Sequence, residues 1–368
     1  KTGLYLYIVK MLLRMFRRKT KRVMLLLLGI VCLLAAAVAL FIHRPSFGRL
    51  PRGERLARIE RSPNYRDGQF RNRERTPQIT ADRGRVRTML GFLFRSTENL
   101  RPAVPVAAVR TDLRELDPAR EQLVWFGHSS YLILSGGRRI LVDPVFRSAA
   151  PLGFLNRAFP GSDLYRPEDM PAIDLLVITH DHWDHLDYCM VRELKDRIGK
   201  VVCPLGVGEH FERWGFAPER IVELDWDEDA SPVEGVRVFC LTSRHFSGRG
   251  LNPNKSLWAS FLLETSARKI YIGGDGGYGN HFAQIGERFP EIDLAVLENG
   301  QYDADWRYIH TLPDQLPQAA ADLGARKVLT VHHSKYALAR HPWDEPLRTA
   351  AAMAGHEPPA VLQPVIGE

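Results

Sequence analysis

The stretch that decides the fold reads THDHWDHLD and covers residues 179–187. It follows an apolar run at residues 173–178, which predicts a buried strand that ends where the motif begins. Three histidines and two aspartates within six residues crowd imidazoles and carboxylates so closely that their repulsion and desolvation need compensation. A bound divalent cation would supply this compensation. The alternative is that the stretch is a solvated polar turn without a metal. The stretch therefore predicts a metal loop at the carboxyl end of a strand.

Further candidate ligands follow later apolar runs. His245 comes after a predicted strand at residues 236–241, Asp275 after one at 269–272, and His332 after one at 327–331. Sheets of the α/β type place their catalytic and binding residues at the carboxyl ends of strands. Two metal ions need about seven or eight protein ligands. The loop and these three residues together approach that number.

Short strands dominate the sequence from about residue 122 onward. Helices are predicted at residues 188–198 and 313–323, between some of the strands. This pattern predicts an α/β (α+β) body of two sheets covered by outer helices. The remaining predicted strands lie at residues 123–126, 130–134, 140–142, 200–204, 221–224, 260–264 and 294–297.

Over about residues 120–340 the chain resembles the metallo-β-lactamase fold superfamily of dinuclear hydrolases. The resemblance rests on the motif at residues 180–185 followed in order by His245, Asp275 and His332. It implies an αββα sandwich that holds two Zn²⁺ per chain, with Asp275 bridging both ions. His-x-His-x-Asp-His, rather than a form with glutamate at the third position, favours zinc hydrolysis over di-iron chemistry. By resemblance the first zinc takes His180, His182 and His245, and the second takes Asp184, His185 and His332.

Within the superfamily, the chain is similar to N-acylphosphatidylethanolamine-hydrolysing phospholipase D and its bacterial relatives. This likeness implies that Asp184 and His310 are catalytic, with His310 placed to contact the scissile phosphate. Asp143 is expected to hydrogen-bond a ligand histidine. His128 is expected either to contact the site or to cap a turn. The stretches that carry the likeness are residues 125–128, 141–146, 179–188, 273–278, 308–310 and 331–332.

The other histidines and aspartates near the motifs are given lesser roles. Asp181, Asp187 and His333 are expected to be structural or loop residues, although His333 stands where the family has a tryptophan. Ser129 and Ser130 likewise replace a common Ala-Thr pair. Surface positions are expected for His210, His281, His341 and His356.

The amino-terminal part predicts a membrane anchor. A basic segment at residues 1–22 precedes an uncharged apolar run at 23–42, about long enough to cross a hydrocarbon core as a helix. The sequence opens with lysine, and Met11 or Met15 is a candidate initiator. The basic cluster favours a single-pass anchor in a bacterial inner membrane with a periplasmic body. A signal peptide cleaved after Ala39 is the alternative.

Charge divides the chain near residue 110. Residues 1–110 carry 24 Lys and Arg against 6 Asp and Glu, whereas residues 111–368 carry 26 against 37. The interval 43–110 therefore reads as a basic juxtamembrane arm, held near anionic lipid or forming a linker. Its apolar patch at 89–94 is expected to pack on the body or to enter the lipid surface. An acidic hydrolase domain at 111–368 argues against a nucleic-acid partner.

These observations predict a zinc phosphodiesterase whose partners are a phospholipid membrane and a lipid substrate. Two alternatives remain open. One is a hydrolase of the same fold that acts on a soluble ester, such as a lactone or a sugar phosphate. The other is a protein that holds metal without catalysis. The metal loop indicates hydrolysis, and only the anchor, the arm and the family likeness indicate lipid.

Overall fold

The computed structural model describes the chain except residues 1, 82–83, 85–86, 89, 92–95 and 356–358, and gives no side-chain positions for 2–6, 8–9 and 12–18. The chain forms two compact units, Lys1–Phe47 and Gly48–Glu368. The first contains helix α1 (Thr2–Ile42) and a 3-10 turn, η1 (Pro45–Phe47). Within α1, the 24 residues Lys19–Ile42 are long enough and on average apolar enough to cross a membrane, and the apolar window inside them is not buried. Most of the expected apolar patch at 89–94, and His356, lie outside the described residues.

The second unit contains a first sheet of six strands among the described residues, and they are hydrogen-bonded in chain order. Strands β3 to β5 are antiparallel, and β5 to β8 are parallel. The strands are β3 (Gln122–Trp125), β4 (Tyr131–Ser135), β5 (Arg138–Val142), β6 (Ile173–Val177), β7 (Ile198–Pro204) and β8 (Ile221–Leu224). Each of the strands expected in this region is present.

The described part of the second sheet has seven strands, ordered from β15 to β9. Its strands β9 to β12 are antiparallel and β12 to β15 parallel, so it repeats the plan of the first sheet. The strands are β9 (Asp229–Val233), β10 (Val236–Leu241), β11 (Ser260–Thr265), β12 (Lys269–Ile272), β13 (Leu294–Glu298), β14 (Lys327–Val331) and β15 (Ala360–Leu362). The edge strands β9 and β15 were not predicted, because β9 contains Asp229, Ser231 and Pro232, and β15 is only three residues long.

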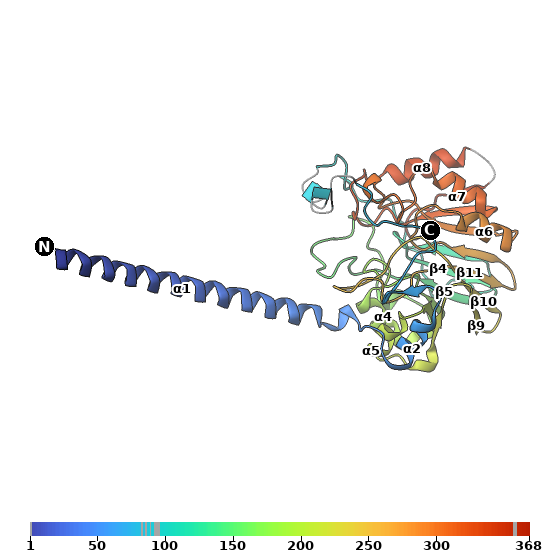
Figure 1. Ribbon diagram of the computed structural model, residues 1–368. Helices are drawn as coiled ribbons and strands as arrows, with labels where there is room; N and C mark the ends of the chain where they lie inside the picture. Colours follow the sequence, from blue (N-terminus) through green and yellow to red (C-terminus); the bar gives the residue numbers. More distant parts are fainter. Residues whose placement is uncertain (1, 82–83, 85–86, 89, 92–95, 356–358) are drawn as a thin grey trace. The chain divides into compact units, whose positions relative to one another are not determined.

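Helices cover the outer faces of both sheets (Figure 1). Helices α6, α7 and α8 pack on the second sheet, and α4 and α5 pack on the first. The alternation expected of a strand decides which side chains face which layer. In β6, Leu175 and Val177 lie between the sheets, whereas Leu176 faces α4. The result is the four-layered αββα sandwich that the sequence predicted. The helices are α4 (Tyr188–Leu194), α5 (Gly208–Arg213), α6 (His281–Arg288), α7 (Leu316–Leu323) and α8 (Glu345–Ala354), with 3-10 turns η2 (Pro167–Asp169), η3 (Lys195–Arg197), η4 (Pro218–Arg220) and η5 (Ala304–Trp306).

The basic arm is part of the second unit, which begins at Gly48 rather than near residue 111. The arm forms helix α2 (Gly53–Arg61) and a short hairpin of β1 (Tyr65–Arg66) and β2 (Gln69–Phe70), none of which was predicted. Ile59 and Phe70 are fully buried in the core between the sheets. The arm's arginines pair with carboxylates of the body, as Arg55 does with Glu223. Its positive charge therefore gives no argument for contact with lipid.

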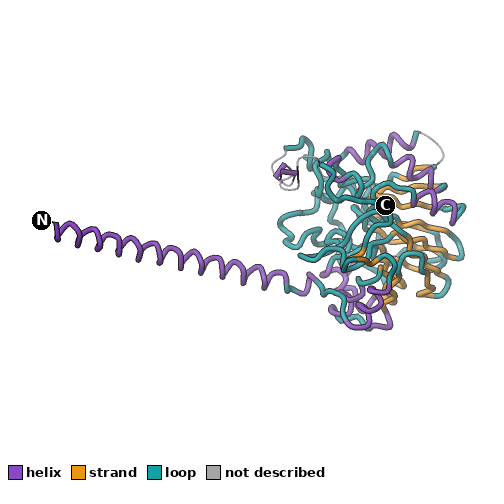
Figure 2. Tube along the Cα trace, viewed as in Figure 1, coloured by secondary structure: helices purple, strands orange, loops and turns teal. Residues whose placement is uncertain are grey.

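Loops gather at one end of the strands (Figure 2). In the first sheet β6 is parallel to β5, and in the second sheet β12, β13 and β14 are parallel and end on the same edge. Strand β10 runs antiparallel to β11, which is antiparallel to β12, so β10 ends on that edge as well. The predicted ligands all follow these strands and are thereby brought together.

Candidate metal centre

The first donor set consists of His180, His182 and His245, as the sequence predicted. Nδ1 of His182 lies 2.9 Å from Nε2 of His180 and 3.2 Å from Nε2 of His245. Burial lowers the pKa of each of these histidines, and neighbouring histidines lower those of His180 and His245 further. Neutral rings whose nitrogens converge in this way can direct three lone pairs at one cation.

The second donor set consists of Asp184, His185 and His332. Oδ2 of Asp184 lies 3.6 Å from Nε2 of His185 and 3.9 Å from Nε2 of His332. Asp275 lies between the two sets. Its Oδ1 is 3.1 Å from His185, and its Oδ2 is 3.4 Å from His332 and 3.6 Å from His245. Asp275 can therefore serve both sets, which is the place that the family resemblance gave it.

An observation that is independent of the family resemblance also indicates that these residues suit a bound cation. Nε2 of His185 and Oδ1 of Asp275 are buried and lie 3.1 Å from each other, but neither makes a hydrogen bond of good geometry. Buried groups of this kind are rare in folded proteins unless they meet an ion or water. The carboxylates of Asp275 and Asp184 also raise the pKa of His185 well above its usual value, despite burial. The centre of the cluster is therefore a place that attracts positive charge.

Outer contacts hold these ligands in orientation. Asp143 accepts a hydrogen bond from Nδ1 of His185 at 2.8 Å, and its two oxygens also accept from the backbone and hydroxyl of Thr179. Nδ1 of His245 donates to the carbonyl oxygen of Ile309 at 2.8 Å. Such contacts fix the ring nitrogen that a histidine presents to a metal. Asp143 thus occupies the position expected of it.

His128 takes part in both of the roles that were considered. Its Nε2 lies 3.0 Å from Oδ2 of Asp184, and its ring lies against that of His332 with centroids 4.2 Å apart. Its backbone carbonyl accepts hydrogen bonds from the Trp125 indole and from the backbone N–H of His332. Next to it, Ser129 places its hydroxyl 2.9 Å from Nδ1 of His332. Both residues therefore support the second donor set.

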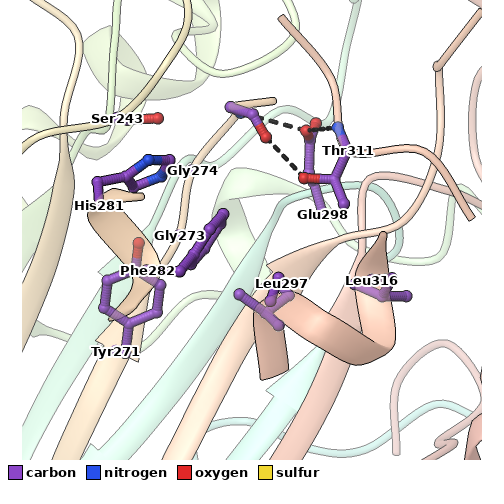
Figure 3. Close-up of a pocket in the computed structure, with 12 residues that line it drawn as sticks. Ser243, Tyr271, Gly273, Gly274, His281, Phe282, Leu297, Glu298, Thr311 and Leu316 are labelled. Carbon is purple, nitrogen blue, oxygen red and sulfur yellow. Dashed lines mark hydrogen bonds between the residues drawn. The ribbon is translucent and has the colours of Figure 1, made fainter. Parts of the chain in front are cut away.

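His310 lies beside the two donor sets, with Nδ1 4.0 Å from Oδ2 of Asp275. It donates from Nδ1 to Oε2 of Glu298 at 2.7 Å. Glu298 is 4% exposed, and its other oxygen accepts from the backbone of Thr311, as Figure 3 shows. Burial opposes the charge on His310, but the Glu298 carboxylate outweighs it and raises the His310 pKa to about 9. Nε2 is thereby left as the nitrogen that can act on a substrate.

Glu298 was not singled out in the sequence, although it ends the predicted strand that became β13. An acidic residue at the end of an otherwise apolar strand was the available signal. Arg249 was missed as well. It is 4% exposed and donates from Nη1 to the carbonyl oxygens of Asp181 and Leu186 at 2.9 and 2.7 Å, with its guanidinium over the Trp183 ring. Arg249 therefore fixes the backbone of the metal loop.

The expectations for the remaining histidines were partly wrong. His210 and His281 are buried, at 3% and 6% exposure, rather than at the surface, and His341 is half-buried against Tyr302. His333 packs beside Trp125 and has the structural character expected of it. Asp187 is structural too, because it accepts hydrogen bonds from the first backbone N–H groups of α4.

Comparisons with known proteins agree with this geometry. Residues 138–333, more than half of the chain, match the family model of the beta-lactamase superfamily domain. An uncharacterized protein of Mycobacterium tuberculosis is 37% identical over 323 residues, which cover 84% of each chain. The N-acyl-phosphatidylethanolamine-hydrolyzing phospholipase D 1 of Caenorhabditis elegans is 29% identical over 229 residues. That match covers 58% of this chain and 63% of the nematode protein.

A solved structure shares the fold. Igni18, a metallo hydrolase from Ignicoccus hospitalis, superposes with a TM-score of 0.52 at 21% identity. The superposition covers 67% of this chain and 95% of that one. The chain belongs to the beta-lactamase superfamily and is a metal-dependent hydrolase of the metallo-β-lactamase fold, related to the N-acylphosphatidylethanolamine-hydrolysing phospholipases D.

Proposed function

We propose that the protein is a membrane-anchored dinuclear zinc phosphodiesterase that cleaves N-acylphosphatidylethanolamine or a related phospholipid. The observation that carries the proposal is the pair of adjacent donor sets around Asp275, with the hydrogen-bonded pair His310–Glu298 beside them. Two zinc ions held by these sets would supply Lewis acidity toward the phosphoryl oxygens. The relationship to the phospholipases D favours a phosphodiester over other substrates.

The chain's own residues are suited to the two proton movements that this hydrolysis needs. Asp184 lies at the edge of the second donor set with its side chain 14% exposed, so it can orient the attacking water. A bond forms between the water oxygen and phosphorus as the water gives up one proton to the solvent, and the bond from phosphorus to the alcohol oxygen breaks. His310, kept protonated by Glu298, can return a proton to that alcohol oxygen. The products are phosphatidic acid and the N-acylated amino alcohol.

The anchor is proposed from α1. The span Lys19–Ile42 contains an apolar window of 18 residues that is not buried, which would be costly in water, and a bilayer removes that cost. We place it as a single pass through a bacterial inner membrane with the second unit in the periplasm. Mass spectrometry of the mature protein from membranes tests this placement. A chain that begins near residue 40 would instead support the cleaved signal peptide.

The proposed activity is tested on vesicles that contain several phospholipid classes. Wild-type protein with zinc should release phosphatidic acid and an N-acylethanolamine from N-acylphosphatidylethanolamine, as identified by mass spectrometry. Lactones, sugar phosphates and short water-soluble diesters serve as the competing substrates. Faster turnover of one of these than of any vesicle lipid would reject the lipid substrate and retain only the hydrolase.

A further inference from the structure

The metal loop is held from behind by Asp181, whose side chain is turned away from the ligands on either side of it. Oδ1 of Asp181 accepts the backbone N–H of Gly248 at 2.7 Å, and Oδ2 accepts the Ser256 hydroxyl at 2.7 Å. The same Oδ2 lies 3.1 Å from Nε2 of His210, which belongs to α5. Asp181 is 3% exposed, so these contacts are screened little by water.

His210 joins this carboxylate to a distant part of the chain. Its Nδ1 accepts the backbone N–H of Arg49 at 3.1 Å, on the opposite side of the ring from Asp181. A neutral imidazole with its hydrogen on Nε2 satisfies both contacts at once. The ring also lies nearly parallel to that of Trp214, at 5.8 Å between centroids. His210 therefore bridges the metal loop and Arg49. Arg49 and Asp181 are 132 positions apart along the chain.

Residues 48–55, which we call the strap, are fastened to α5 on both sides of this bridge. Arg55 places its guanidinium 2.5 Å from carboxylate oxygens of Glu209, Glu212 and Glu223. Arg49 also pairs with Glu209, the residue directly before His210. The side chain of Arg55 is only 14% exposed, so these contacts are stronger than ordinary surface ion pairs.

Gly48 shows how closely the strap approaches His210. A Cβ atom at this position would lie 1.9 Å from Nδ1 of His210, and the backbone has φ +71°. Only glycine combines that conformation with such a close approach. Gly53 offers a matched contrast, because it has φ +57° but no atom within 4 Å of a Cβ. Alanine at either position strains the backbone, and only alanine at Gly48 displaces His210.

We infer that the strap is a positioning element for the metal loop, acting through Arg49, His210 and Asp181. The inference rests on the metal centre of the proposed function and applies whatever the substrate is. In the chain the strap directly follows α1 and η1, so it joins the apolar helix to the loop that carries the ligands. Loosening the strap should let the loop relax and release metal, even though no strap residue is a ligand.

The test measures how fast zinc passes from the purified, zinc-loaded full chain to a chromogenic chelator. Gly48→Ala and His210→Phe should release zinc about tenfold faster than wild type, a change typical of lost outer contacts at metal sites. Gly53→Ala should stay within about twofold of wild type, as expected of a substitution without new contacts. His210→Gln, whose amide can still donate to Asp181, should release zinc more slowly than His210→Phe. The cobalt-substituted protein gives a second readout, because its visible spectrum should change in Gly48→Ala and not in Gly53→Ala.

Two outcomes separate this inference from the proposed function. Equal release rates and equal cobalt spectra for wild type, Gly48→Ala and His210→Phe would overturn the role of the strap and leave the metal centre standing. A wild-type chain that binds no zinc would overturn the metal centre, and the strap's role with it. His210→Phe keeps the test decisive if Gly48→Ala does not fold.

Discussion

The metal loop at residues 179–187 and the part of the basic arm at residues 48–75 differ in where their partners lie along the chain. The loop brings most of its chemistry with it, because four of the predicted ligands fall within six residues. The arm carries arginines whose ion-pair partners lie far away in the sequence. Arg55 and its partner Glu209, for example, are 154 residues apart. The loop could therefore be interpreted from its own sequence, and the arm could not.

The difference teaches that the net charge of a segment does not identify its partner. The arm was expected to lie near anionic lipid or to form a linker, and its arginines instead meet an acidic body within the same compact unit. If this is right, substitutions in the loop should remove activity while leaving the fold intact. Substitutions in the arm should instead reduce the free energy of unfolding. The predictions below test that contrast.

The largest effect is expected from His182→Ala in the loop. It removes the nitrogen on which His180 and His245 converge, so a zinc ion held there as proposed would lose one of its ligands. Turnover should fall by about a thousandfold or more, the size of effect expected when metal-ion catalysis is lost. The unfolding midpoint of metal-free protein should not fall, because crowded imidazoles repel one another. Substantial turnover by metal-free His182→Ala protein would break the contrast.

His310→Gln should reduce turnover by about a hundredfold to ten-thousandfold, the usual contribution of general acid catalysis. Glu298→Gln sharpens this test through pH. Burial opposes protonation of His310, and the Glu298 carboxylate raises its pKa to about 9, so the protonated acid is lost as pH rises through that pKa. Without the carboxylate the alkaline fall in activity should move to lower pH. A cation bound nearby lowers the pKa of His310 in the wild type and in Glu298→Gln alike, so the wild-type pKa stays the higher of the two.

Arg249→Met should affect both the loop and the fold. It leaves the carbonyl oxygens of Asp181 and Leu186 buried without their donor. The free energy of unfolding should fall by about 3 kcal/mol, as expected for unpaired buried polar groups. Urea unfolding measures the loss, and Arg249→Lys should recover only part of it because an ammonium cannot span both carbonyls. A urea unfolding midpoint of Arg249→Met equal to that of the wild type would show that Arg249 does not stabilise the loop.

The smallest effect is expected in the arm. Arg55→Gln should lower the free energy of unfolding by about 2 kcal/mol, because three carboxylates lose a largely buried partner. Arg237→Gln is the matched control, since Arg237 forms an exposed pair with Asp229 and its loss should leave the midpoint unchanged. Equal midpoints for the two variants would show that the arm is not held by these pairs.

Much of the fold followed from local patterns. Apolar runs located the buried strands such as β6 and β14, since a strand covered on both faces leaves a continuous hydrophobic signature. The edge strand β9 was missed because polar residues and a proline interrupt it, and β15 was missed because its apolar run is only three residues long and partly exposed. Helix α2 escaped because its charged residues outnumber the apolar ones that it buries.

The donor sets could be predicted because every ligand follows an apolar strand and metal chemistry restricts the residue types. Supporting residues carry no such restriction. Glu298, Arg249 and His210 act through contacts with residues far away in the sequence, and glutamate and arginine belong to types that are usually exposed. Their roles depend on which loops the topology brings together, and no spacing along the chain records that.

The most direct test of the central claim is the amount of zinc bound per chain, measured together with turnover in wild type and Asp275→Asn. Because Asp275 lies between the two donor sets, we predict two zinc ions per wild-type chain. Asp275→Asn should hold at most one and should not hydrolyse the substrate. Wild-type protein that turns over without bound metal, or Asp275→Asn protein with full zinc content and full activity, would contradict the account.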